Sequence, residues 1–355
     1  MQIKRLIMQR LICFMILNVC VILFAADPVF HDALPFLEGR HIEDAPVYGR
    51  LPREMETKVR PPVWRLGLNS AGLAAHFMTD ATEIHVRWEV LNDFHMVHMA
   101  GTGIRGVDLY VREGNTWSFV GTGKPYAARN TAKLIANLSK ETREYLLYCP
   151  LYDGLKELAI GIDEGADIVA VERNEKPLVF YGTSITQGGC VSRPGMAYPA
   201  IIGRELDRES INLGFSGNGR MDPEIIEFIA GIDAACVVFD CLPNMDIEMI
   251  LERAEHAIRS FLETSPGTPL LLVPNFMPEN GRHDPALNSA ILAENAELET
   301  IYKRLKKQYR HLHLLPYRTL RDVPREGTVD GVHLTDLGQL RMARVLEKKI
   351  KRICR

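Results

Sequence analysis

The sequence lacks several features that would assign it quickly to a class. Its 42 basic and 45 acidic residues leave a net charge of only −3, so no overall positive field would attract nucleic acid. Its seven cysteines include no C-x-x-C pair and are too scattered for a disulfide framework or a zinc site. Hydrophobic residues make up 46% of the chain and charged residues 25%, as in ordinary globular proteins. The 355 residues therefore suffice for one large or two ordinary globular domains.

The N-terminal residues 1–26 differ from the rest of the chain. Three basic residues precede an uncharged apolar run from Leu11 to Ala26. A basic head followed by an apolar stretch predicts an export signal, and so a periplasmic or extracellular protein. An uncleaved membrane anchor, or a lipid attached at Cys20, remains an alternative. We therefore expect contact with a membrane only through this N-terminus.

Residues 27–170 have the sequence pattern expected of an accessory β-domain. Period-two alternation is clear at 84–90 and 106–112, and turn residues separate the short segments. Further strands are expected at 116–120, 145–148 and 158–162. This pattern predicts a β-sandwich of jelly-roll-like form. Residues 27–60 show no clear pattern and are expected to form an irregular lead-in.

Residues 171–355 alternate between short apolar runs and amphipathic segments. The expected strands are 178–181, 210–213, 236–242, 270–273 and 312–315. The expected helices are 198–207, 223–232 (capped by Asp222), 247–262, 285–308 and 335–353. Five strand–helix repeats with near-continuous apolar strands predict a parallel sheet covered on both faces. The third strand carries both Cys236 and Cys241, which are expected to be small buried hydrophobes. Ligands of such sheets bind beyond the carboxyl ends of the strands.

Two features at those strand ends could supply a nucleophile and its base. Ser184 lies in Gly182-Thr183-Ser184 between the first strand and a helix, where a backbone N–H can meet developing negative charge. His333 follows Asp330 by three residues, so the carboxylate can accept from one imidazole nitrogen while the other faces a serine. Each feature has an ordinary explanation, since serine caps turns and Asp330 could be only a turn residue.

Two further features could stabilise an oxyanion. Gly214 follows the second strand and could bring a backbone N–H close to a ligand. Asn244 follows the third strand and could donate from its side-chain amide. Turn chemistry explains either residue about equally well. No ligand spacing links His283, His311 or His313 with His333, so no metal and no organic cofactor are expected.

Taken in order, these four features resemble the blocks of the SGNH/GDSL hydrolase family. The resemblance spans about 178–354 and implies a flavodoxin-like three-layer α/β (αβα) fold with five parallel strands. It implies that Ser184 is the nucleophile, His333 the base and Asp330 its orienting carboxylate. It also implies an oxyanion hole from Ser184, Gly214 and Asn244. Two blocks depart from the family pattern, with Thr183 in place of Asp and Leu242 in place of Gly.

Upstream, residues 106–110 read Gly-Val-Asp-Leu-Tyr. This segment resembles the G-x-D-L-Y signature of the β-domain that precedes the SGNH domain in one bacterial subgroup. Two-domain carbohydrate esterases join their domains in the same order. The resemblance therefore implies a serine esterase acting on O-acetyl groups, and export favours a carbohydrate substrate.

Other functions remain open at this stage. The enzyme could act on a lipid or a thioester, although no exposed amphipathic lid is recognisable. The chain could instead be a non-catalytic carbohydrate-binding protein, or Cys190 could serve as a thiol nucleophile. Tyr198, Trp117 and Arg220 are candidates for contact with substrate. The sugar, the acyl group and the oligomeric state are not specified by these patterns.

Overall fold

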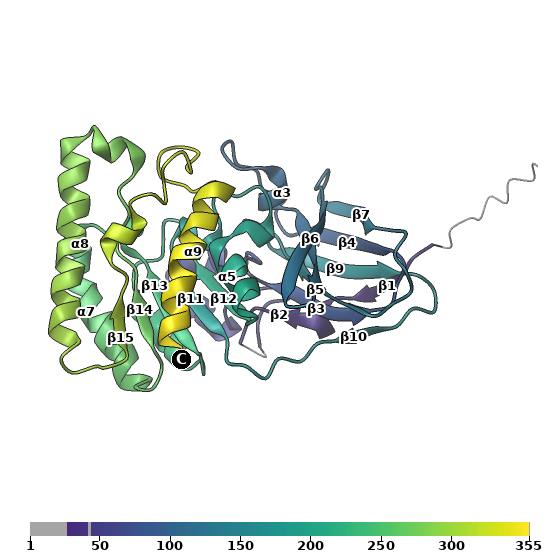
Figure 1. Cartoon of the computed structure of the whole chain (residues 1–355), viewed down its shortest axis with the longest axis horizontal. Helices are drawn as coiled ribbons and strands as arrows, with labels where there is room; N and C mark the ends of the chain where they lie inside the picture. Colours follow the sequence, from purple (N-terminus) through teal and green to yellow (C-terminus); the bar gives the residue numbers. More distant parts are fainter. Residues whose placement is uncertain (1–26, 42–43, 355) are drawn as a thin grey trace, which may run out of the picture.

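A computed structural model describes residues 27–41 and 44–354. The predicted export signal, residues 1–26, lies outside the described residues. Figure 1 shows a β-sandwich beside an α/β domain, with the chain passing from one to the other after residue 170. Within the described part of the chain, no helix is long and apolar enough to cross a membrane.

Two antiparallel sheets make up the β-sandwich. The first has the strand order β1 (Val29–Asp32), β9 (Leu155–Ile162), β4 (Ile84–Val90) and β7 (Arg129–Ile135). The second has the order β10 (Ile168–Ala170), β3 (Ala74–Thr79), β8 (Arg143–Tyr148), β5 (Val107–Glu113) and β6 (Thr116–Gly123), with β2 (Leu37–Glu38) paired to β3. The expectation of an irregular lead-in over 27–60 is wrong in part, since this segment contributes β1 and β2.

Alternation along β4 shows why these residues form a sandwich. Every second side chain, including Val86 and Trp88, is fully buried between the sheets. The Trp88 indole N–H donates to the Arg105 carbonyl at 2.9 Å, so the largest side chain of this core leaves no polar atom unsatisfied. Period-two burial of this kind fixes the register, because a one-residue slip would expose the whole apolar set.

The α/β domain confirms the predicted flavodoxin-like fold. Its five parallel strands have the order β12 (Ser210–Gly214), β11 (Leu178–Gly182), β13 (Cys236–Asp240), β14 (Leu270–Leu272) and β15 (Leu312–Leu314). The main helices are α5 (Tyr198–Leu206), α6 (Pro223–Ala230), α7 (Ile247–Thr264), α8 (Pro285–Leu305) and α9 (Asp336–Ile353). These bounds lie within a few residues of the predicted ones.

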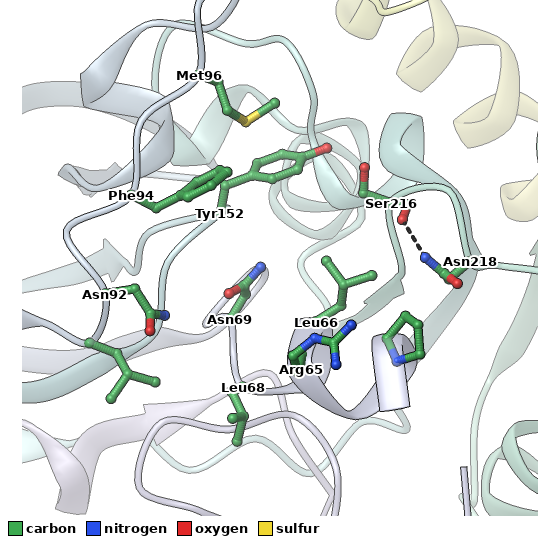
Figure 2. Close-up of a pocket in the computed structure, with 12 residues that line it drawn as sticks. Arg65, Leu66, Leu68, Asn69, Asn92, Phe94, Met96, Tyr152, Ser216 and Asn218 are labelled. Atoms are coloured by element: carbon green, nitrogen blue, oxygen red, sulfur yellow. Dashed lines mark hydrogen bonds between the residues drawn. The ribbon is translucent and has the colours of Figure 1, made fainter. Parts of the chain in front are cut away.

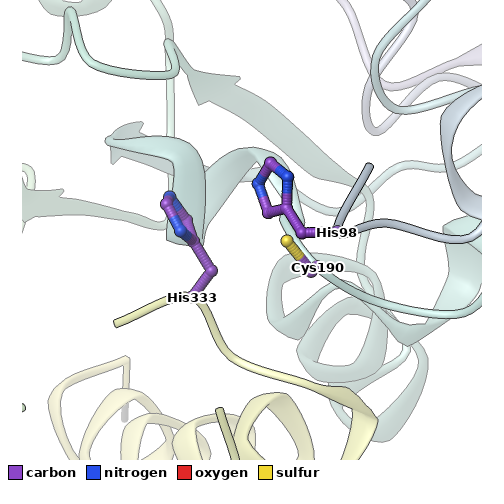
Figure 3. Close-up of side chains that lie close together, drawn as sticks. All are labelled: His98, Cys190 and His333. Atoms are coloured by element: carbon purple, nitrogen blue, oxygen red, sulfur yellow. The ribbon is translucent and has the colours of Figure 1, made fainter. Parts of the chain in front are cut away.

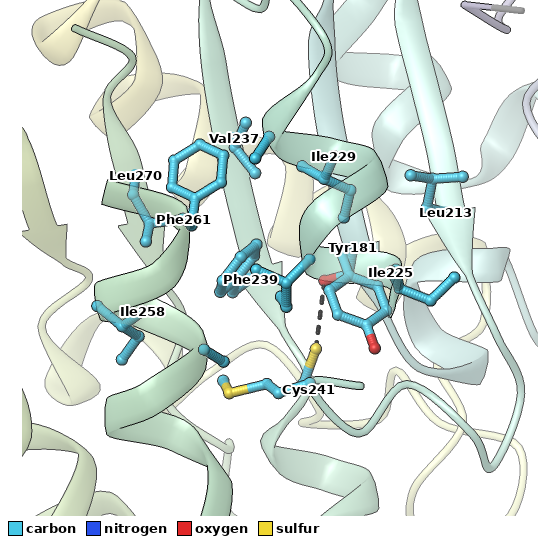
Figure 4. Close-up of a cluster of buried hydrophobic side chains, with 14 of the residues drawn as sticks. Tyr181, Leu213, Ile225, Ile229, Val237, Phe239, Cys241, Ile258, Phe261 and Leu270 are labelled. Atoms are coloured by element: carbon cyan, nitrogen blue, oxygen red, sulfur yellow. Dashed lines mark hydrogen bonds between the residues drawn. The ribbon is translucent and has the colours of Figure 1, made fainter. Parts of the chain in front are cut away.

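Both faces of the parallel sheet are buried, as its apolar strands predicted. Phe239 on β13 packs with Tyr181 and Phe261 in the core under α6, α7 and α8 (Figure 4). The next residue back, Val238, points to the opposite face, which α5 and α9 cover. Cys236 and Cys241 are fully buried, as expected of small hydrophobes.

One segment of the N-terminal region packs on the α/β domain instead of on the sandwich. It contains a 3-10 helix (Arg53–Thr57) and α2 (Pro61–Gly67), and Met55 and Val63 join the core under α6 and α7. Arg60, just before α2, donates to both oxygens of Asp222 at 3.1 and 2.9 Å. Asp222 does occupy the N-cap position of α6, but it makes no side-chain capping bond because Arg60 uses its carboxylate.

The G-x-D-L-Y segment is a docking element between the two domains. Asp108 is fully buried and accepts from the Arg193 guanidinium at 2.6 Å and from the Gly195 N–H at 2.9 Å. Tyr110 also bonds to Arg193, and a Cβ on Gly195 would lie 2.4 Å from its ring. Burial raises the pKa of Asp108, although the charge of Arg193 opposes this effect. The sandwich is thus fixed against the loop that leads into α5.

Candidate active site

The fold places Ser184 at the carboxyl edge of the parallel sheet. β11 ends at Gly182, and the short helix α4 (Ser184–Gln187) begins two residues later. Thr183 caps this helix by accepting from the Ile185 N–H at 3.2 Å. Gly182 is required here, because a Cβ would lie 2.1 Å from the Thr186 hydroxyl. The serine side chain sits in a tight turn, with only 6% of the residue's surface exposed.

Asp330 and His333 lie in the loop that precedes α9. One carboxylate oxygen of Asp330 accepts from the backbone N–H groups of Val332 at 3.0 Å and His333 at 2.7 Å. The other oxygen lies 2.7 Å from His333 Nδ1. Partial burial alone would raise the pKa of Asp330, but the hydrogen bonds from the His333 side chain and the two backbone amides outweigh it and lower the pKa to about 2. Asp330 is therefore a firmly ionised acceptor.

The imidazole connects this loop to the serine. His333 Nε2 lies 2.9 Å from Ser184 Oγ, although the two residues are 149 positions apart in the chain. With Asp330 accepting at Nδ1, the ring carries its proton on Nδ1 and presents a free lone pair at Nε2 to the hydroxyl. Carboxylate, imidazole and hydroxyl in this order have the geometry of the serine hydrolase class.

Gly214 does not have the position that the sequence suggested. Its N–H donates to Asn212 Oδ1 at 2.9 Å, so it is not offered to the site. The glycine is needed for packing, because a Cβ would lie 2.2 Å from the Gln187 nitrogen of α4. The prediction of Gly214 as an oxyanion donor is therefore wrong.

Gly217, three residues further along the same loop, has the properties expected of such a donor. It is exposed, it adopts a φ of +68°, and a Cβ there would meet nothing within 4 Å. Across the described part of the chain, no group accepts its N–H. The loop packs closely against the end of β11, just before Ser184, because a Cβ on Gly219 would lie 1.9 Å from the Gly182 carbonyl oxygen.

Asn244 ends a 3-10 helix (Leu242–Asn244) that follows β13 directly. Its Oδ1 is buried without a hydrogen-bond partner among the described residues. A buried side-chain oxygen without a hydrogen-bond partner is uncommon in folded proteins, so this half-buried side chain is a candidate for contact with a ligand. β13 is the neighbour of β11 in the sheet, with Asp240 opposite Gly182, so Asn244 and Ser184 leave the same edge.

Of the three residues suggested as substrate contacts, two belong to packing. Tyr198 is fully buried, and its hydroxyl donates to Asp240 at 3.0 Å. Trp117 lies edge-on to His76, 5.9 Å between ring centroids, away from Ser184 and on the second sheet of the sandwich. Arg220 lies in the Gly217 loop and donates to the Gly217 carbonyl at 3.0 Å.

A pocket of about 670 Å³ opens between the two domains (Figure 2). Its residues come from α2 and the turn after it, from the loop after β4, from the loop between β8 and β9, and from the Gly217 loop. They are Pro62, Arg65, Leu66, Leu68, Asn69, Leu91, Asn92, Phe94, Met96, Tyr152, Ser216 and Asn218. Tyr152 connects the pocket to the edge of the sheet where Ser184 lies, because its hydroxyl donates to the Ser184 carbonyl at 3.2 Å.

A buried carboxylate holds the loop that borders this pocket. Asp153 is fully buried and accepts from the backbone N–H groups of Asn92 and Phe94, both at 2.9 Å. The Asn92 side chain adds a further bond to the same carboxylate at 3.1 Å. Sequence reasoning missed this loop. Its available signal was a cluster of aromatic, methionine and histidine residues at 94–99 without strand alternation.

The same loop brings His98 close to the imidazole of His333, with 5.7 Å between the two ring centroids. Cys190 lies nearby and is 8% exposed. Burial, together with the negative charge of Asp330, raises the pKa of Cys190 to about 12. A thiol in this environment stays protonated, which disfavours Cys190 as a nucleophile.

Comparison with known proteins agrees with the class that this geometry defines. Residues 175–351 match the GDSL-like lipase/acylhydrolase family, and residues 29–168 match the N-terminal domain of SGNH-type esterases, named GxDLY. The crystal structure of a protein described as a GDSL-like lipase from Bacteroides ovatus is 33% identical. It superposes with a TM-score of 0.86 over 92% of this chain and 97% of that one. The chain therefore belongs to the GDSL-like lipase/acylhydrolase family and is an enzyme of the esterase type.

Two more distant structures share the fold. The salicylyl-acyltransferase SsfX3 of a tetracycline biosynthetic pathway is 15% identical, with a TM-score of 0.76 over 92% of this chain and 97% of that one. A family two carbohydrate esterase from Clostridium thermocellum, solved with cellohexaose, is 14% identical, with a TM-score of 0.57 over 79% and 92%. No curated protein sequence matches the chain significantly.

Proposed function

We propose that the protein is a serine esterase in which Ser184 attacks the ester, His333 is the general base and Asp330 orients it. The observation that carries this proposal is the continuous chain of contacts from Asp330 Oδ2 to His333 Nδ1 at 2.7 Å and from His333 Nε2 to Ser184 Oγ at 2.9 Å. A serine hydroxyl is a poor nucleophile until a base removes its proton, and these distances allow that transfer.

The proposed reaction has two steps. Ser184 Oγ attacks the ester carbonyl carbon, and its proton passes to His333 Nε2. The carbon–oxygen bond to the alcohol breaks, and the imidazolium returns the proton to the leaving oxygen. Water then attacks the acyl-serine, gives its proton to His333 and releases the acid, with the Ser184 hydroxyl restored. The reaction is a hydrolysis and needs no oxidant or reductant.

Three donors at the sheet edge support the tetrahedral intermediate in this proposal. They are the Ser184 N–H, the Gly217 N–H and the Asn244 side-chain amide. Gly217 replaces the predicted Gly214, whose N–H is already bonded to Asn212. Removing one oxyanion donor costs about 3 kcal/mol in other enzymes, so the set matters as much as the base.

For the substrate, we propose an O-acetyl ester on a carbohydrate. The pocket of about 670 Å³ lies within the usual range of about 300–1,000 Å³ for small-molecule sites. It combines an aromatic wall of Phe94 and Tyr152 with polar groups of Asn69 and Asn92, a mixture that suits sugar rings. The predicted export signal would place the enzyme where extracellular glycans are found. The apolar residues Leu66, Leu91 and Met96 in the same pocket support a longer acyl chain as the second candidate.

A serine substitution with a matched control tests the proposal. We expect Ser184→Ala to fold normally and to lose roughly 10⁴-fold or more in kcat on p-nitrophenyl acetate. Ser289→Ala, at an exposed serine on α8, should keep full activity. Undiminished turnover by Ser184→Ala would remove the nucleophile assignment. Absence of labelling of the unmodified enzyme by a fluorophosphonate would favour a non-catalytic carbohydrate-binding protein.

The acyl group is tested separately from the nucleophile. We expect acetyl esters to be hydrolysed faster than octanoyl esters, and acetate to be released from a panel of acetylated glycans. A strong preference for the octanoyl ester would overturn the carbohydrate assignment and favour a lipid or thioester acylhydrolase.

A further inference from the structure

Three metal-ligating side chains converge at the mouth of the candidate active site. His98, Cys190 and His333 each offer one ligand atom, and these atoms all lie within 4.8 Å of one another. Figure 3 shows the two rings and the sulfur gathered at one place. They come from three separate segments: the loop after β4, the loop after α4 and the loop before α9. The mechanism proposed above uses only His333.

Two imidazoles and one thiol are ligands that suit a thiophilic divalent cation such as zinc. Zinc takes imidazole nitrogen at about 2.0–2.1 Å and thiolate sulfur at about 2.3 Å in a tetrahedral site. Those bond lengths put neighbouring ligand atoms about 3.3–3.6 Å apart. The three atoms therefore need to close by at most about 1.5 Å to share an ion.

The positions of the three ligands allow this small closure. Cys190 is anchored, because it is buried and its N–H donates to the Leu334 carbonyl at 2.8 Å. His333 is anchored by its bond to Asp330. His98 is half-buried on a loop with several exposed residues, including Val97, so its ring is the ligand that can move toward the other two.

We propose that His98, Cys190 and His333 form an inhibitory site for zinc or a similar thiophilic divalent cation. Asp330 completes the arrangement by holding His333 Nδ1, since a carboxylate behind a ligating imidazole fixes its tautomer and strengthens it as a ligand. His333 Nε2 is thereby left as the coordinating atom. A water molecule can supply the fourth ligand.

Binding of the ion switches off the serine. The Cys190 S–H bond breaks, its proton leaves to solvent, and a sulfur–metal bond forms, with no change of oxidation state. The His333 Nε2 lone pair, which would otherwise take the Ser184 proton, is donated to the metal. The hydroxyl then has no base, and hydrolysis stops until the ion is removed. Only the inhibitory effect rests on the proposed function, whereas the binding itself does not.

Metal binding and inhibition are measured on the full chain with matched variants. We expect the purified enzyme, and Ser184→Ala equally, to bind one Zn²⁺ by equilibrium dialysis. We expect Co²⁺ to give sulfur-to-cobalt charge-transfer absorption that is lost in Cys190→Ala. His98→Ala and Cys190→Ala should each weaken Zn²⁺ binding and inhibition by at least about 10-fold. His95→Ala removes an exposed histidine three residues earlier in the same loop and should bind as the unmodified enzyme does.

Each outcome bears on the proposal. Zn²⁺ inhibition that a chelator reverses, and that both ligand variants resist, supports it. Equal inhibition of the unmodified enzyme, His98→Ala and Cys190→Ala overturns it, as does failure of Ser184→Ala to bind the ion. If Ser184→Ala were to keep esterase activity while still binding one Zn²⁺, the proposed function would fail and the metal site would stand.

Discussion

Replacement of Asp330 by Asn isolates the electrostatic role of the carboxylate from its structural role. The two backbone N–H groups of Val332 and His333 both donate to the same oxygen, Oδ1. The amide oxygen of an asparagine can keep both of those bonds. The change falls on the second oxygen, which lies 2.7 Å from His333 Nδ1 and becomes an NH₂ group.

The expected effect follows from the tautomer of His333. A donor at position 330 can face Nδ1 only if Nδ1 carries no proton. The ring proton then sits on Nε2 and donates to Ser184 Oγ, so the imidazole cannot accept the serine proton. The equivalent change in a serine protease lowers kcat about 10⁴-fold. We expect a loss of roughly 10³- to 10⁴-fold here, or about 4–5.5 kcal/mol in activation free energy.

The assay is kcat/KM on p-nitrophenyl acetate, together with the rate of fluorophosphonate labelling. Both rates should fall in parallel, because both need a deprotonated Ser184. Asp322→Asn is the matched control, since it changes an exposed carboxylate in the preceding loop, and it should be silent. Thermal unfolding should show that both variants are folded. A loss below about tenfold in folded Asp330→Asn would refute the reasoning.

Two further predictions concern stability. Burial raises the pKa of Asp240 to about 7, against an ordinary value of 3.8, so the folded chain holds this carboxyl neutral where the unfolded chain ionises it. The free energy of unfolding should therefore fall as pH rises from about 4 to 7, by at most about 4 kcal/mol. Urea unfolding of Asp240→Asn should show a weaker dependence of this free energy on pH than the unmodified protein shows, and equal dependence in the two proteins would contradict the prediction. Arg50 is buried and donates to four carbonyls, so Arg50→Met leaves those acceptors without this donor and should cost about 3–5 kcal/mol of unfolding free energy. A melting temperature unchanged from that of the unmodified protein would refute this.

The sequence pattern predicted an element correctly where the period of its apolar residues matches the burial of its side chains in the structure. The α/β domain was predicted nearly element by element, because apolar runs such as 236–239 have few environments other than a buried parallel strand. The β-sandwich was predicted less completely. β1 and β3 were missed because burial along them does not alternate: β3 is buried at five of its six positions, and β1 at none.

The site could be predicted where a motif keeps donor and acceptor close in sequence. Asp330 and His333 are three residues apart, so their bond is a local turn property. Gly214 was mistaken for a donor because its use by Asn212 and α4 depends on packing that no local pattern encodes. Gly217 lies in the same loop, but its exposure became evident only in three dimensions.

The sequence alone determined the parallel sheet, the preceding β-domain and the order of Ser184, Asn244, Asp330 and His333 along the chain. These follow from the period of the apolar residues and from short motifs, which are local properties. Tertiary structure alone decided which atoms meet. It brought the imidazole within 2.9 Å of a hydroxyl 149 residues away, and it placed His98 and Cys190 beside that imidazole. The contact between His333 and Ser184 depends on packing within the α/β domain, and the approach of His98 depends on how the two domains pack. Packing of either kind is a property of the whole chain.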